Sequence, residues 1–125
     1  MIFKRKSDMK RSALLLCFLG LALPARAADS SADAGLAEVR DLGRVNGQAL
    51  ACGYAETVSR IKAVMIYHAP KSRSYGAAFE ETTNKAFLDQ SRKEMTTCPD
   101  GPTLNGQIDE ATQRLQVAVP APATK

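Results

Sequence analysis

The sequence predicts an all-α fold: a small bundle of three to four helices stapled by one disulfide and preceded by an N-terminal signal peptide. Three observations lead to this prediction. The chain begins with a basic segment, an apolar run and a small-residue cleavage point. The remainder shows helical rather than strand periodicity. It also keeps two cysteines, Cys52 and Cys98, in a chain expected to meet an oxidising compartment.

The N-terminus has the three-part layout of a secretory signal peptide. Basic residues between positions 4 and 11 precede an apolar run over residues 13–23, and small residues follow. The run is roughly half as long as a membrane-spanning helix requires, so we expect no stable membrane insertion. We predict that residues 1–27 are the signal peptide and that cleavage between Ala27 and Ala28 releases the protein into the periplasm or the medium.

Lipid attachment at Cys17 is the alternative fate of this segment. A lipoprotein signal places a small residue before the acylated cysteine, but Leu16 stands there, and Cys17 lies inside the apolar run rather than at its end. We therefore expect Cys17 to be removed with the signal peptide.

The positive charge of the chain belongs to the same segment. The whole chain has a net charge of +4, and residues 1–27 contain six basic side chains and one acidic one. Removing this balance of +5 leaves −1 for the rest of the chain, whose charges are interspersed. A basic footprint for nucleic acid is therefore absent from the expected mature protein, and we expect no nucleic-acid partner.

The expected mature chain is large enough for one domain and too short for two. We assign residues 28–119 to a single helical domain and residues 120–125, which are rich in proline and alanine, to a disordered tail. With Cys52 and Cys98 as the two remaining cysteines, only one intramolecular pairing is possible. Closing a loop of this length stabilises a fold by roughly 3–4 kcal/mol in the chain-entropy model.

The first helical region spans residues 36–69 and ends before Pro70, which disfavours helix in the residue that precedes it. It contains Gly43, Gly47 and Gly53, and each glycine costs a helix about 1 kcal/mol relative to alanine. We expect one helix with a kink here. The alternative is a break between Gly47 and Gly53 that gives two helices.

Five residues of this region form a candidate interaction shelf. Gly43 and Gly47 are spaced to make a flat surface for close helix–helix approach, and Asn46, Leu50 and Gly53 share their stripe. We expect the shelf to receive a partner helix or a second copy of the chain. A buried Asn46 needs hydrogen-bond partners and would either fix helix register or line a binding groove.

Two further helices complete the expected bundle. Ser72 or Ser74 can cap a helix over residues 75–97, and the turn at residues 99–102 separates it from a third helix. Thr103 is the expected cap of that third helix. Its apolar positions recur with helical spacing at Leu104, Ile108, Ala111 and Leu115. A Cys52–Cys98 bond would then pin an antiparallel pair, with the last helix covering the seam.

No motif with catalytic, metal or cofactor specificity is present in the sequence. His68 is the only histidine, and a zinc site needs four ligands. It lies near a helix end, where we expect a capping or surface role, with contact to a ligand as the alternative. We therefore expect no enzyme, no metal and no cofactor.

Two functions remain from different classes. The first is a small exported non-catalytic protein that binds another protein in the periplasm, as a chaperone, an inhibitor or an immunity protein does, or that pairs with a second copy of itself. The alternative is a periplasmic carrier that holds a small ligand or a metal between its helices, in a pocket that reaches Asn46 or His68.

Overall fold

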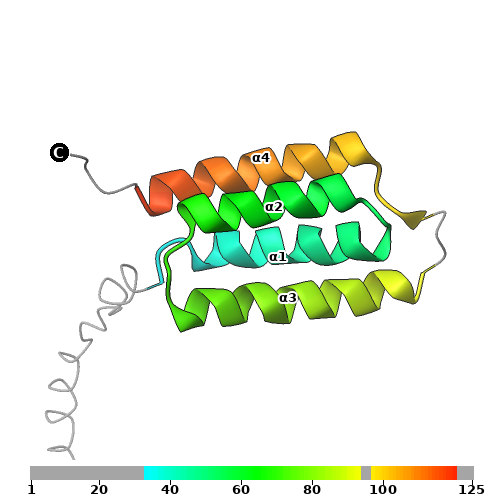
Figure 1. Cartoon of the computed structure of the whole chain (residues 1–125), viewed down its shortest axis with the longest axis horizontal. Coiled ribbons are helices and arrows are strands. Elements are labelled where there is room, and N and C mark those ends of the chain that lie inside the picture. The colour runs from blue at the N-terminus through cyan, green and yellow to red at the C-terminus, as the bar shows by residue number, and fades with distance from the viewer. Residues whose placement is uncertain (1–32, 94–96, 121–125) are drawn as a thin grey trace, which may run out of the picture.

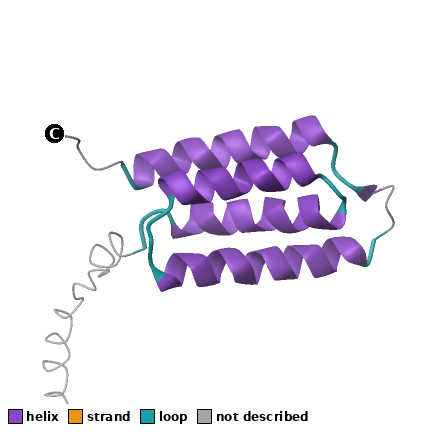
Figure 2. Ribbon diagram, viewed as in Figure 1, coloured by secondary structure: helices purple, strands orange, loops and turns teal. Residues whose placement is uncertain are grey.

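The computed structural model describes residues 33–93 and 97–120 as a four-helix bundle (Figure 1). The helices are α1 (Leu36–Ala51), α2 (Ala55–His68), α3 (Arg73–Ser91) and α4 (Gly101–Ala118). No strand is present in these residues (Figure 2). A Cys52–Cys98 disulfide joins Cα atoms 5.9 Å apart. The predicted all-α class, the helix number and the disulfide are confirmed, whereas the predicted signal peptide and residues 121–125 of the tail lie outside the described residues.

The first helical region is broken into α1 and α2, so the expected single kinked helix is wrong. Gly53 adopts a left-handed backbone conformation with φ of 78°. Its N–H group donates to the carbonyl of Leu50, and the N–H group of Tyr54 donates to that of Ala49 at 2.8 Å. These two bonds form the Schellman motif that ends many helices at a glycine. The chain therefore reverses at Gly53 and starts α2 in the opposite direction.

The four helices run alternately up and down along the bundle (Figure 1). As a consequence α1 and α3 are parallel, which corrects the antiparallel pair expected around the disulfide. Gly43 lies against Thr82, and four residues later Gly47 lies against Ala86. The contacts therefore move in the same direction along both helices, as in a parallel pair. The correction follows from the break at Gly53, because the extra helix α2 reverses the chain once more before α3 begins.

Helix α1 is the central element of the bundle. It packs against all three other helices, with α3 on one side and with α2 and α4, which also touch each other, on the other (Figure 1). A helix that is covered on more than one side is expected to be apolar on more than one side. The larger core lies between α1, α2 and α4, where the largest fully buried side chains are Val39, Leu42, Val45, Ile61, Leu104, Ile108 and Leu115.

Helix α3 packs mainly on α1 and buries small or polar side chains. They are Tyr75, Ala78, Thr83, Ala86 and Gln90. The helix ends at Ser91 rather than near Thr97. A continued helix would carry Cys98 roughly 10 Å further along the axis, because each residue adds about 1.5 Å. Ending the helix early lets Cys98 turn back to the end of α1.

The helix starts refine the predicted caps. Ser72 is the N-cap residue of α3, but its hydroxyl lies 3.2 Å from that of Ser74 and makes no capping bond. For α4 the cap is Asp100 and not Thr103. The Asp100 carboxylate accepts the N–H group of Thr103 at 2.8 Å, which satisfies one of the free donors of the first turn.

The apolar spacing predicted for the last helix is confirmed, since Leu104, Ile108, Ala111 and Leu115 are all buried. Among the described helices, none has the length and apolar character needed to cross a membrane.

Candidate functional site

The predicted interaction shelf is divided between two environments. Gly43 and Gly47 face α3 of the same chain. A Cβ atom built on Gly43 would lie 2.7 Å from the Phe79 carbonyl oxygen, and one on Gly47 would lie 2.3 Å from that of Thr83. The expected close helix–helix approach is therefore present, but its partner is α3. This corrects the expectation that these two glycines receive a separate partner, because no room is left over them.

Asn46 is buried beside these glycines and links α1 to α3. The residue is 4% exposed, and its amide Nδ2 donates to the Thr83 hydroxyl at 3.3 Å. That hydroxyl donates in turn to the carbonyl of Gly43 at 3.2 Å. The network joins the two helices at one register. It also leaves the Asn46 Oδ1 atom buried without a hydrogen-bond partner.

A hollow of about 440 Å³ lies beside this network, and we name it the Asn46 hollow. It is lined by Asn46, Phe79, Glu80, Thr83 and Asn84. Glu80 and Asn84 are exposed, whereas Phe79 is half-buried against the core. The hollow therefore has a polar, buried floor on α1 and an open rim on α3.

The remaining shelf residues, Leu50 and Gly53, line a second hollow at the turn between α1 and α2. This Leu50 hollow has a volume of about 380 Å³ and is bounded by Ala49, Leu50, Gly53, Tyr54, Ala55, Val58 and Ser59. Leu50 is 45% exposed, although Ala49 beside it is fully buried. Most of the lining is apolar, so the hollow presents hydrophobic surface at the edge of the core.

The two hollows are reached from neighbouring turns of α1. Asn46 and Leu50 are four residues apart in one helix, which places them on neighbouring turns of one face. Phe87, which is 40% exposed, follows Thr83 by four residues on α3 and extends this face. Surface with both polar and apolar character thus extends from the contact between α1 and α3 to the turn between α1 and α2.

His68 is the last residue of α2 and lies at the opposite end of the bundle from the disulfide (Figure 1). Its Nε2 atom is 3.3 Å from the Nε2 atom of Gln116 on α4. Both residues line a hollow of about 520 Å³ together with Tyr67 and Lys71, among others. The hollow contains no carboxylate side chain, so it does not combine His68 with an acid.

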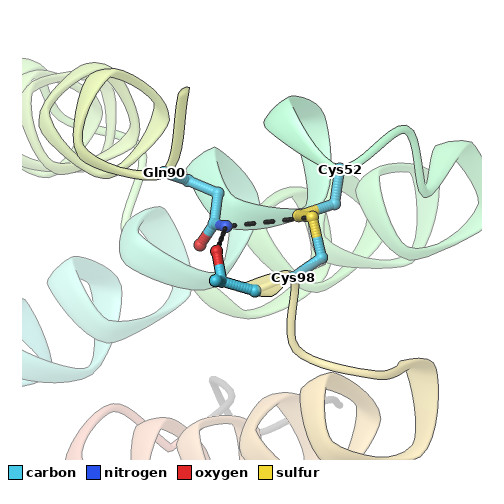
Figure 3. The surroundings of a disulfide bond; sticks show 4 residues. Cys52, Gln90 and Cys98 are labelled. Atoms are coloured by element: carbon cyan, nitrogen blue, oxygen red, sulfur yellow. Dashed lines mark hydrogen bonds between the residues drawn. A yellow bond between two sulfur atoms is a disulfide. The ribbon is translucent and has the colours of Figure 1, made fainter. Parts of the chain in front are cut away.

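The disulfide closes the end of the α1–α3 pair and is covered by Gln90 (Figure 3). The Gln90 Nε2 atom lies 3.4 Å from the Thr97 hydroxyl and 3.8 Å from the Cys98 sulfur. Gln90 is 5% exposed and Cys52 is 8% exposed. The packing of Gln90 over the bond indicates a structural disulfide.

Charged residues in the described part of the chain mostly join helices or neighbouring turns. Arg114 of α4 pairs with Asp41 of α1 at 3.1 Å. On α3, a hydrogen bond and the positive charge of Lys85 hold the pKa of Asp89 below its ordinary value. No group of three potential metal ligands lies together in residues 33–93 and 97–120.

Sequence reasoning missed the α3 half of this surface. It gave Glu80, Thr83 and Asn84 no role. A usable signal was the spacing of the small residues Ala78, Thr82 and Ala86, which mark the face of α3 that meets the glycines of α1. Once this face of α3 is known, the residues beside it can be expected to line a hollow between α1 and α3.

The chain matches no protein-family model, no curated protein and no solved structure.

Proposed function

We propose that this chain is a small exported non-catalytic protein that binds another protein in the periplasm through the Leu50 hollow. The carrying observation is the exposure of Leu50 in an apolar hollow at the turn between α1 and α2. Export is supported by the order of charged, apolar and small residues at the N-terminus and by the disulfide.

The Leu50 hollow has the size and composition of an anchor site. Protein interfaces draw much of their affinity from a few apolar or aromatic side chains that fill pockets near the centre. Tyr54 and Val58 line the hollow with Leu50, and its volume suits one or two such side chains. Single exposed leucines are common on protein surfaces, and it is the hollow around this one that supports binding.

A pair of matched variants tests the proposal. Leu50→Lys places a charge in the hollow, whereas Leu88→Lys changes a leucine of α3 that is 53% exposed and lines none of the hollows described above. Each oxidised mature protein is used as bait in host periplasm, with bound proteins read by mass spectrometry. We expect one stoichiometric partner that Leu50→Lys loses and Leu88→Lys keeps. A partner kept by both variants, or no partner for the unchanged protein, would contradict the proposal.

A carrier of a small ligand is the second candidate, and the hollows beside Asn46 and His68 favour it. Native mass spectrometry of protein purified from its own periplasm distinguishes the two functions. A stoichiometric extra mass below that of a polypeptide supports the carrier, whereas a bare chain together with a captured protein supports the protein-binding function.

A further inference from the structure

The hydrogen-bond network fixes which end of the Asn46 amide faces Thr83. The Thr83 hydroxyl has one proton, and it donates that proton to the carbonyl of Gly43. The hydroxyl can therefore only accept from Asn46, so the amide nitrogen faces it and Oδ1 points elsewhere. A buried acceptor without a donor is unfavourable, and a ligand that supplied an N–H group to Oδ1 would relieve this cost.

The other residues of the Asn46 hollow favour a positive charge on that donor. Glu80 contributes a carboxylate at the rim, and the aromatic ring of Phe79 lines the same hollow. Aromatic faces attract cations, and a carboxylate forms charge-assisted hydrogen bonds with them. No basic residue lines the hollow. The lining thus combines a buried amide, a negative charge and an aromatic ring.

We propose that the Asn46 hollow binds a primary ammonium group, and that this group is a lysine side chain of the protein partner. The proposal rests on the proposed function. The partner's lysine would place its ammonium among the Asn46 amide, the Glu80 carboxylate and the Phe79 ring, which line the same hollow. Glu80 and Asn84 are exposed at the rim and can rotate aside to admit it.

The position of the Leu50 hollow favours a polypeptide as the source of the lysine. Four residues of helix separate Asn46 from Leu50, an axial distance of about 6 Å. One extended or helical segment can therefore place an apolar side chain in the Leu50 hollow and a lysine in the Asn46 hollow. A partner segment of this chemistry is complementary to both ends of the surface.

A titration with a matched pair of small probes tests the proposal. The probes are Nα-acetyl-lysine methylamide and Nα-acetyl-norleucine methylamide, which differ in that norleucine carries no ammonium. The full mature protein is labelled with ¹⁵N and followed by NMR at millimolar probe concentrations. We expect the lysine probe to shift the side-chain amide of Asn46 and the backbone amides of Thr83 and Asn84, and the norleucine probe to leave them unchanged.

Two neighbouring acids supply the control variants. Glu80 lines the hollow and Glu81 does not, and both are exposed, so neither substitution disturbs the core. We expect Glu80→Gln to lower the affinity for the lysine probe about two- to fivefold, as for an exposed ion pair. We expect Glu81→Gln to leave this affinity unchanged. Equal shifts from both probes, no shift from the lysine probe, or equal affinities in the two variants would overturn the proposal.

A third probe separates the two sources of an ammonium group. If n-butylammonium shifts the same amides and the lysine probe does not, the source is a free amine and the lysine assignment is wrong. The same variants also distinguish a failure of this inference from a failure of the proposed function. A partner that Leu50→Lys loses but Glu80→Gln keeps at unchanged affinity would preserve the function and overturn the lysine.

Discussion

Gly47 lies directly against the backbone of Thr83, at a distance that excludes even a methyl group. A Cβ atom on Gly47 would fall 2.3 Å from the Thr83 carbonyl oxygen and 2.7 Å from the backbone nitrogen of Phe87. Backbone atoms cannot rotate aside as a side chain can. The two glycines of α1 therefore determine how closely α3 approaches, and the cost of glycine in a helix is offset by this packing.

Adding a methyl group at this contact tests that conclusion. We expect Gly47→Ala to lower the free energy of unfolding by roughly 1–3 kcal/mol, because α3 must move away from α1. Urea denaturation of the oxidised protein measures the change. Gly106→Ala is the matched control on α4, since a Cβ there meets nothing within 4 Å. It should raise stability by up to about 1 kcal/mol. Equal stability of the two variants would contradict the close packing.

The disulfide closes a loop with a sequence separation of 46 residues. Replacing both cysteines by serine should lower the free energy of unfolding by about 3–4 kcal/mol, since the unfolded chain regains its freedom. Urea denaturation measures the total. Hydrogen exchange checks the cause, because amides that exchange only through global unfolding, including those in the middle of α4, should exchange faster by a matching factor. An unchanged urea midpoint would show that the bond adds no stability.

The Asp100 cap gives a prediction about pH. Hydrogen bonds from Thr103 lower the pKa of Asp100 below its ordinary value of 3.8. A lowered pKa in the folded state means that the carboxylate stabilises the fold above pH 3.8 and that this contribution is lost as the pH falls through the folded-state value. We expect Asp100→Ala to be less stable than the unchanged protein at pH 7 and to approach it near pH 2.

Serine at the same position provides the control for that experiment. Asp100→Ser keeps an oxygen that can accept from Thr103 but carries no titratable charge. Its stability relative to Asp100→Ala should therefore stay constant between pH 7 and pH 2. Thermal unfolding at several pH values gives both comparisons. A constant difference between the unchanged protein and Asp100→Ala would argue against the charged cap.

Tyr75 connects the start of α3 to the segment before α1. Its hydroxyl donates to the carbonyl of Ala34 at 2.7 Å, while its ring is buried in the core. Tyr75→Phe keeps the ring and removes the hydroxyl, so we expect a loss of about 1 kcal/mol in the free energy of unfolding. Tyr67→Phe, at a side chain that is 79% exposed, should change nothing measurable. Equal effects of the two variants would exclude a role for the hydroxyl.

Local sequence patterns predicted the buried faces and the ends of helices where these depend on the residues of one helix alone. The spacing from Leu104 to Leu115 identified the buried face of α4, and Pro70 marked the end of α2. Gly53 also carried a readable signal, because glycine is the usual residue just past a helix end. Residues 48–51 are strong helix formers and favour continuation of the helix, but the Schellman bonds at Gly53 override this local preference.

The candidate site was less predictable because it depends on contacts between distant residues. Asn46 was expected to be buried, and it is, but its bond to Thr83 spans 37 residues. No local pattern indicates which helix covers Gly43 and Gly47, since a helix of the same chain and a helix of a partner require the same small residues. The site therefore depends on the position of α3 against α1, which no local pattern determines.

The central position of α1 also bears on the order in which the chain can fold. Synthesis proceeds from the N-terminus, so α1 is made first, while α4, which completes its apolar surroundings, is made last. The hairpin of α1 and α2 alone leaves Leu42 and Val45 incompletely covered, because the main core also needs Leu104 and Ile108. We infer that stable folding waits for the last helix. A chain with this topology stays pliable until its fourth helix has been made.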